Sequence, residues 1–271
     1  MFDYHIHSDF SADCSTPMEK TIEKAIEDGL KEICFTDHID YDYPDPTITF
    51  DLDLPAYEQK ITDMQSLYSD RITIKKGVEI GVQPHLLEKY TTLLEKETFD
   101  FIICSMHTTD RKDLHSGSLF DNRTTEEAFA KYYEELLFCV ENYEAYTILG
   151  HLDLVKRYTD EKVDHDFHDL IQQIFKEIIP KGKGIEINTS SYRYGMTSGM
   201  PSVDILKLYK ELGGEIITLG SDSHTETTLA YQFEQTLATL DELGFKYIAT
   251  FNQQEPTFHP IKSLQKFFAD R

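Results

Sequence analysis

The chain has 271 residues, of which 40% are hydrophobic and 28% are charged, so it can bury one sizeable core as ordinary globular proteins do. Its net charge of −23 argues against a nucleic-acid partner, because binding that polyanion requires a basic surface that releases counterions. No apolar run approaches the roughly 18 residues of a membrane span, and Met1 leads directly into the first expected strand. We therefore expect a cytoplasmic protein with no signal peptide and no membrane partner.

Short apolar segments alternate with amphipathic segments along the whole chain. The apolar segments are typical of buried strands, expected at 2–7, 32–38, 72–80, 99–107, 145–151, 184–189 and 215–221, with a weaker one at 246–251. The amphipathic segments are expected to be helices at 16–28, 55–69, 84–97, 124–142, 165–179, 202–212, 227–243 and 260–269. Alternation of this kind implies parallel strands. Seven or eight such units without a linker favour a single (β/α) barrel over an open doubly wound sheet.

Two histidines in the first expected strand are the earliest sign of a metal site. His5 and His7 lie two residues apart, so their side chains point to the same face of a strand and can bind one cation together. Asp13 follows in a loop rich in serine and aspartate, where its carboxylate can supply a further ligand. Because such histidine pairs are also common in ordinary cores, the metal interpretation depends on the rest of the chain.

Histidines and carboxylates recur where the expected strands end, which is the face on which barrel enzymes build their sites. One histidine in such a place is more often an ordinary core residue. Several buried histidines and carboxylates that meet at one end of a barrel need cations between them. The candidate ligands are His5, His7, Asp13, His38, Glu79, His107, His151, Asp222 and His224. Nine ligands are too many for one tetrahedral ion and are enough for three.

The same residues carry a resemblance to a known family. Its pieces are His5-Ile6-His7, Thr36-Asp37-His38, Gly77-Val78-Glu79, Ser105-Met106-His107, Gly150-His151-Leu152-Asp153 and Gly220-Ser221-Asp222-Ser223-His224. In this order they resemble the PHP (polymerase and histidinol phosphatase) superfamily and, more narrowly, its histidinol-phosphate phosphatases. The resemblance implies an α/β fold, a distorted (β/α)7 TIM-like barrel with the active site at the C-terminal ends of the strands. It also implies one metallohydrolase domain over residues 1–271, with the segment 246–251 peripheral to the barrel.

The resemblance implies three divalent metal ions, zinc first, with manganese or iron as alternatives. The first ion would be held by His5, His7, Glu79 and Asp222. Glu79 would bridge to a second ion, which His107 and His151 also hold. The third ion would take Asp13, His38 and His224. Some members of the family have histidine where this chain has Asp13, and a carboxylate there favours a harder ion.

The resemblance also implies the reaction and its other residues. Arg157 and Arg193 match the basic residues that bind phosphate in the family, and the planar guanidinium group suits this anion. We expect hydrolysis of L-histidinol phosphate, a step of histidine biosynthesis, by attack of a metal-bridging hydroxide. Asp222, His224 and Asp153 are the candidates for proton transfer to the leaving group. Acidic loops at 40–45 and 110–113 are candidates for contact with the amine and imidazole of the substrate.

Several alternatives remain open from the sequence. Another PHP phosphoesterase, acting on phosphotyrosine or on small nucleotides, would carry the same ligand set and differ only in its loops. A metallohydrolase of the amidohydrolase type would show a different order of ligands. A non-catalytic metal-binding scaffold is the alternative from another class of protein. In every case the expected partner is a small molecule, and the chain is expected to be a monomer or a homodimer.

Overall fold

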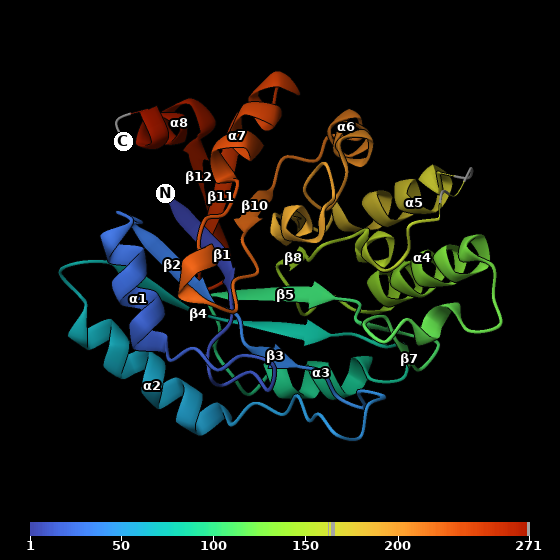
Figure 1. Ribbon diagram of the computed structural model, residues 1–271, viewed down its shortest axis with the longest axis horizontal. Coiled ribbons are helices and arrows are strands. Elements are labelled where there is room, and N and C mark those ends of the chain that lie inside the picture. Colours follow the sequence, from blue (N-terminus) through green and yellow to red (C-terminus); the bar gives the residue numbers. More distant parts are fainter. Residues whose placement is uncertain (162, 164–165, 270–271) are drawn as a thin grey trace.

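Seven parallel strands form a nearly closed barrel in the computed structural model, which describes residues 1–161, 163 and 166–269 (Figure 1). Their order is β1 (Phe2–Ile6), β2 (Glu32–Phe35), β4 (Thr73–Gly81), β5 (Phe101–Ser105), β8 (Ile148–Leu149), β9 (Gly184–Asn188) and β10 (Ile217–Gly220). The chain after β10 returns to β1, where the amide of His7 donates to the Ser223 carbonyl at 2.9 Å. The expected distorted (β/α)7 barrel is therefore confirmed.

An outer layer of helices surrounds the strands (Figure 1). The α-helices are α1 (Met18–Glu27), α2 (Leu54–Leu67), α3 (Leu87–Leu94), α4 (Thr125–Asn142), α5 (His168–Ile178), α6 (Val203–Glu211), α7 (Phe233–Glu242) and α8 (Ile261–Ala269). Short 3-10 helices are η1 (Ser118–Phe120), η2 (Leu154–Tyr158), η3 (Ser190–Tyr194) and η4 (Glu226–Thr228). Each long helix buries one apolar face, as α5 does with Ile171, Ile174, Phe175 and Ile178. Among the described residues, no helix is long and apolar enough to cross a bilayer.

A few elements differ from the sequence prediction. Helix α7 begins at Phe233 rather than at 227, because Ala230 and Gln232 adopt left-handed backbone angles that interrupt a helix. The first residue of the helix expected at 165–179 lies outside the described residues. Strands that the sequence pattern did not reveal are β3 (His38–Ile39), β6 (Thr108–Thr109), β7 (Lys112–Asp113) and β12 (Glu255–Pro260).

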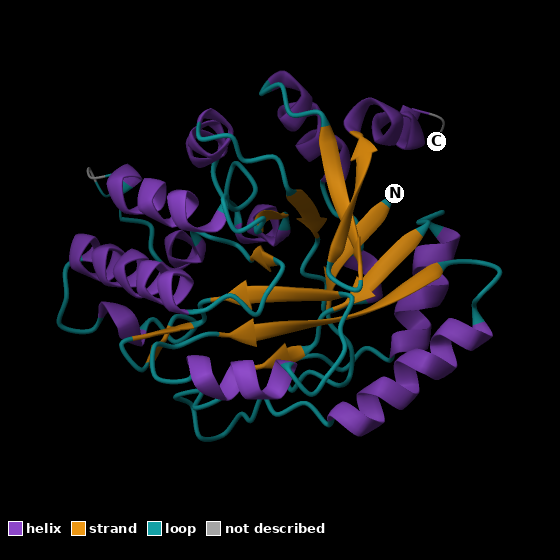
Figure 2. Ribbon diagram, turned by 180° about the vertical axis from the view of Figure 1, so that it is seen from behind, coloured by secondary structure: helices purple, strands orange, loops and turns teal. Residues whose placement is uncertain are grey.

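The weak strand expected near the C-terminus is peripheral to the barrel. It is β11 (Tyr247–Asn252), and it pairs in antiparallel fashion with β12. This hairpin is a separate two-stranded sheet, and Figure 2 shows it close to both chain termini. Phe251 of the hairpin enters the bottom of the barrel, where its amide donates to the Tyr4 hydroxyl at 2.9 Å. The hairpin therefore closes the end of the barrel opposite to the C-terminal ends of the strands.

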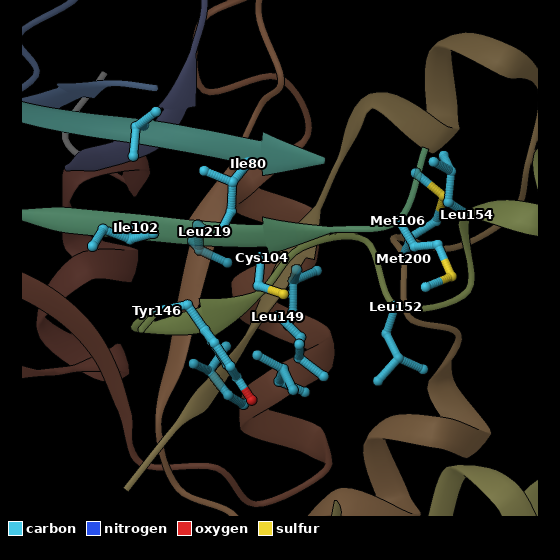
Figure 3. Close-up of a cluster of buried hydrophobic side chains, with 14 of the residues drawn as sticks. Ile80, Ile102, Cys104, Met106, Tyr146, Leu149, Leu152, Leu154, Met200 and Leu219 are labelled. Atoms are coloured by element: carbon cyan, nitrogen blue, oxygen red, sulfur yellow. The ribbon is translucent and has the colours of Figure 1, made fainter. Parts of the chain in front are cut away.

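Alternation along the strands divides the molecule into an inner and an outer core. On β5, Ile102 and Cys104 face outward into the main core, where they lie near Ile80 and Leu149 (Figure 3). Residues that face the lower part of the barrel interior form a second apolar cluster, Tyr4, Cys34, Phe101, Ile103, Ile148, Ala249 and Phe251. The upper interior is different, because it holds the buried polar side chains His5, Glu79, Ser105, Glu186 and Asn188. This polar layer is the floor of the candidate site.

Candidate active site

The structure brings all nine candidate ligands together at the C-terminal ends of the barrel strands. They come from β1 and the loop after it (His5, His7, Asp13), from β3 (His38), from β4 (Glu79), and from the segments after β5 (His107), β8 (His151) and β10 (Asp222, His224). Three sets have ligand atoms within 4.8 Å of one another: His5, His7 and Asp222; His7, His38 and His224; and His38, Glu79 and His107. Because the sets share members, these seven side chains form one continuous cluster, which Asp13 joins through His224 at 3.1 Å and His151 joins through Glu79 at 2.9 Å.

Glu79 lies at the centre of the cluster, and its two oxygens face different histidines. Its Oε2 atom lies 3.1 Å from His5 Nε2 and 3.2 Å from His38 Nδ1. Its Oε1 atom lies 2.9 Å from His151 Nε2 and 3.3 Å from His107 Nε2. The hydroxyl of Ser105 donates to the same Oε1 atom at 2.6 Å and holds the carboxylate in place. This is the arrangement that a carboxylate shared by two cations requires.

The other two carboxylates lie at the edges of the cluster. Asp222 Oδ1 lies 3.4 Å from His7 Nε2 and 3.7 Å from His5 Nε2. Asp13 Oδ2 lies 3.1 Å from His224 Nε2 and 3.6 Å from His38 Nε2. Although burial would raise the pKa of Asp13, the imidazoles of His224 and His38 hold that pKa far below its usual range. Asp13 is therefore an anionic ligand candidate rather than a neutral acid.

The donor atoms of this cluster fit divalent cations. The Nε2 atoms of His5 and His7 face each other at 3.0 Å, and a pair of neutral imidazoles can share at most one proton there. Burial, together with the neighbouring His224 and His38, lowers the pKa of His7 to about 3, so its ring stays neutral with a free lone pair. Mixed imidazole and carboxylate ligands suit zinc, manganese or iron(II). The residues present therefore fit the metal ions that the sequence pattern predicts.

The sequence pattern did not reveal two buried carboxylates as partners of the ligand histidines, although the loop that contains Asp40 is among the expected candidates for substrate contact. Asp40 accepts a hydrogen bond from His107 Nδ1 at 2.6 Å, and Glu186 accepts one from His5 Nδ1 at 2.6 Å. Burial by itself would lower the pKa of His107, but the carboxylates of Asp40 and Glu79 outweigh burial and raise it to about 10. Two signals were available in the sequence: Asp40 follows His38 at the same-face spacing, and Glu186 is a lone charge within an apolar strand.

A cavity of about 510 Å³ opens above the cluster. Its floor includes Asp13, His38, Glu79, His107, His151, Asp222 and His224. Two arginines, Arg157 and Arg193, also line the cavity. The rest of its wall is apolar and aromatic, with Tyr43, Ile48, Phe50, Leu114, Leu154, Tyr158 and Tyr194, and His115 also lines the cavity. A ligand with an anionic group and an apolar or planar group would therefore find contacts for both in this space.

Both predicted phosphate-binding arginines face the cavity and are held in position by neighbours. Arg193 donates to the carbonyls of Ser221 at 2.7 Å and Asp222 at 2.8 Å, so it is anchored to the loop that carries two candidate ligands. Arg157 donates to the Ser190 hydroxyl, and its guanidinium lies 4.3 Å from the centre of the Tyr194 ring. The Nε atom of Arg157 is buried without a hydrogen-bond partner among the described residues.

The structure separates the three candidates for proton transfer. Asp222 and His224 line the cavity, whereas Asp153 does not. Asp153 is fully buried, where it accepts a hydrogen bond from the Ser202 amide at 3.1 Å and pairs with Lys156 at 3.0 Å. The acidic loops are also mostly turned away, because only Asp40 of their carboxylates lines the cavity. Asp113, for example, accepts hydrogen bonds from Ser116 and from the Tyr43 hydroxyl.

A (β/α) barrel with a cluster of imidazoles and carboxylates at the C-terminal ends of its strands defines a metallohydrolase of the barrel type. Comparison with known proteins agrees with this class and narrows it. The sequence profile of the PHP domain matches residues 3–190. Histidinol-phosphatase of Lactococcus lactis is 35% identical over 92% of this chain and 94% of its own length. The chain therefore belongs to the PHP domain family.

Solved structures agree in fold over nearly the whole chain. The crystal structure of histidinol phosphate phosphatase from Lactococcus lactis, complexed with zinc, L-histidinol and phosphate, matches with a TM-score of 0.86 at 33% identity. The match covers 94% of this chain and 98% of that protein. The putative histidinol phosphatase from Listeria monocytogenes matches with a TM-score of 0.75, covering 87% of this chain and 99% of its own. At 17% identity, this second match supports the fold alone.

Proposed function

We propose that this protein is a histidinol-phosphate phosphatase that hydrolyses L-histidinol phosphate to L-histidinol and phosphate. The observation that carries the proposal is the match in fold and sequence to the Lactococcus lactis enzyme, whose crystal structure holds zinc together with L-histidinol and phosphate. The cavity of this chain suits such a substrate, because two arginines and several aromatic side chains line it together with the ligand cluster.

We further propose that three divalent cations, zinc first, occupy the cluster of nine ligands. Support comes from the position of Glu79, whose two oxygens face separate histidines, and from Asp13, which lies close to His38 and His224 at the far edge. Bound divalent cations lower the pKa of water and thereby supply a hydroxide nucleophile near neutral pH. They also account for an anionic substrate in an acidic protein, because they add positive charge at the place where the phosphate binds.

Arg157 and Arg193 bind the phosphate and orient it in this proposal. Both residues line the cavity, and hydrogen bonds to Ser190, Ser221 and Asp222 hold their guanidinium groups in place. Such preorganised donors cost no reorganisation when negative charge develops on the phosphoryl oxygens.

The leaving group must take up a proton when the bond between phosphorus and its oxygen breaks. His224 and Asp222 are the candidates that reach the cavity, and His224 Nδ1 lies 3.6 Å from Asp222 Oδ1. We therefore propose that these two residues pass to the alkoxide of histidinol the proton that a bound water loses when it becomes the hydroxide nucleophile. Asp153 instead would hold Lys156 and the start of α6 in position, since its side chain is buried beneath them.

A substrate panel with the zinc-loaded enzyme tests the proposed function. Phosphate release is measured with L-histidinol phosphate, phosphotyrosine, a small nucleotide and a generic aryl phosphate under identical conditions. We expect kcat/KM to be highest for L-histidinol phosphate, because the crystal structure of the similar Lactococcus lactis enzyme holds L-histidinol and phosphate. Equal or higher kcat/KM for the aryl phosphate would show that the narrow assignment is wrong.

A further inference from the structure

We propose that Asp40 and Glu186 are a pair of positioning residues. Each accepts a hydrogen bond from Nδ1 of one histidine, His107 or His5, and so directs the Nε2 atom of that ring toward the proposed metal ions. The inference rests on the proposed metal site, but it concerns two side chains outside the nine ligands. The two carboxylates would increase the affinity of the site for metal ions and would take no part in the chemical step. Neither residue belongs to the motifs that identify the family in this sequence.

The two carboxylates contact the histidines in the same way. Asp40 Oδ2 lies 2.6 Å from His107 Nδ1, and Glu186 Oε1 lies 2.6 Å from His5 Nδ1. A carboxylate at this distance accepts the hydrogen bond of Nδ1–H, so Nε2 is the nitrogen whose lone pair binds a cation once its own proton has been displaced. Both Nε2 atoms then point at Glu79, at 3.3 Å from His107 and 3.1 Å from His5. Each carboxylate thus selects the tautomer whose free nitrogen faces the proposed ions.

Glycines at the ends of two strands make room for these carboxylates. A Cβ atom on Gly81, the last residue of β4, would lie 2.3 Å from the Cγ atom of Asp40. A Cβ atom on Gly220, the last residue of β10, would lie 2.1 Å from Glu186 Oε1. Both distances are far below contact distance, so any larger residue would displace the carboxylate. The same local arrangement therefore occurs twice, on opposite sides of the cluster.

Each carboxylate also connects its histidine to a further part of the site. Glu186 Oε2 accepts hydrogen bonds from the His151 amide at 2.9 Å and from Asn188 Nδ2 at 3.3 Å. Asn188 in turn donates to Asp222 Oδ2 at 3.3 Å. On the other side, Asp40 Oδ1 lies 3.6 Å from His38 Nδ1, so this carboxylate lies beside a second candidate ligand. Loss of either carboxylate should therefore loosen more than one histidine.

Zinc affinity of purified variants tests the inference without any substrate. Asp40→Asn and Glu186→Gln are measured by chelator competition and by counting bound zinc, with Asp100→Asn as the matched control. Asp100 is a carboxylate at the opposite end of the barrel, where it accepts hydrogen bonds from the amides of Lys76 and Gln253. We expect zinc affinity to fall about ten- to a hundredfold in both test variants and to stay unchanged in the control.

Gly81→Ala provides a second route to the same loss, because its Cβ atom would meet only Asp40 among the nearest atoms and would displace the carboxylate while leaving it in the chain. A Glu186→Gln protein that fails to fold is replaced by Glu186→Asp, which keeps the charge but withdraws it from His5. Circular dichroism checks folding in each case. Wild-type zinc affinity in the folded Asp40 and Glu186 variants would overturn the inference, even if histidinol phosphate remains the best substrate. A wild-type protein that binds no zinc would overturn the inference and the metal site together, whereas altered substrate preference alone would affect only the proposed function.

Discussion

The Nε2 atoms of His107 and His151 face each other at 3.3 Å, and both lie within 3.3 Å of Glu79 Oε1. Two ring nitrogens and a carboxylate oxygen converge here, although the residues come from three different strand ends. In the absence of a cation, such a group holds together only through protons on the imidazoles. When a divalent cation lies between these three atoms, all of them can be its ligands.

Metal removal should destabilise the fold as well as abolish activity. Chelation leaves many buried polar side chains without the cations that satisfy them, and a ligand bound only by the native state contributes to its stability. We expect a lower Tm after dialysis against a strong chelator and recovery of both Tm and phosphatase activity when zinc is added back. The fully loaded protein should hold close to three ions per chain by elemental analysis. Full activity at one ion per chain would contradict the three-ion site.

Glu79→Gln should separate a bridging ligand from an ordinary buried glutamate. The amide keeps the size of the side chain but removes the charge that binds two cations at once. We expect activity to fall by orders of magnitude and metal content to drop, with the circular dichroism spectrum retained. Glu32→Gln is the control, because Glu32 is a strand glutamate near the closed end of the barrel that accepts a hydrogen bond from Tyr4. Normal turnover and full metal content in Glu79→Gln would refute the site.

Arg157→Ala and Arg193→Ala should weaken phosphate binding and leave metal content unchanged. Loss of a charge-assisted contact typically costs about 1.5–3 kcal/mol, which corresponds to roughly ten- to more than a hundredfold in kcat/KM. Arg123→Ala serves as the surface control, because Arg123 pairs with Asp110 and does not line the cavity. Steady-state kinetics with L-histidinol phosphate provide the measurement. A loss below threefold in both test variants would remove the arginines from the proposed mechanism.

Phe50→Leu should affect the organic part of the substrate more than its phosphate. The Phe50 ring contacts the Tyr43 ring edge-on at 5.0 Å and lies on the aromatic wall of the cavity. An aromatic contact contributes about 0.5–1.5 kcal/mol, so we expect KM for L-histidinol phosphate to rise roughly two- to tenfold. Competitive inhibition by inorganic phosphate should stay the same, since this ligand does not reach the wall. Parallel changes in both constants would mean that the substitution disturbs the metal cluster instead.

Asp153→Asn and His224→Asn should behave differently, because only His224 lines the cavity. We expect Asp153→Asn to lower Tm through its buried contacts with Lys156 and Ser202, while zinc content and most of the turnover are retained. His224→Asn should lose turnover strongly. Activity and Tm are measured on the same zinc-loaded samples. Strong loss of turnover in Asp153→Asn at normal Tm and zinc content would show that Asp153 takes part in the reaction.

The sequence alone predicted the barrel and the ligand cluster, and the physical reason is the regularity of parallel strands. Side chains two residues apart on a strand share a face, and the C-terminal ends of barrel strands meet at one mouth. His5, His7, Glu79 and the histidines at the later strand ends could therefore be assigned to one site without knowledge of any distance. The peripheral place of the segment 246–251 also followed, from the resemblance to the family.

Only the tertiary structure decided which side chains support the cluster and which are turned away from it. Glu186 meets His5 across 181 residues of chain, and the glycine that makes room for it, Gly220, belongs to a different strand. Contacts of this kind depend on how strands pack across the barrel interior, and no local pattern encodes them. The same is true of Asp153, whose motif places it beside His151 but whose side chain turns into the core toward Lys156. Spacing along a strand determines which face a residue occupies, whereas the partner it meets there is set by packing between strands that are distant in the sequence.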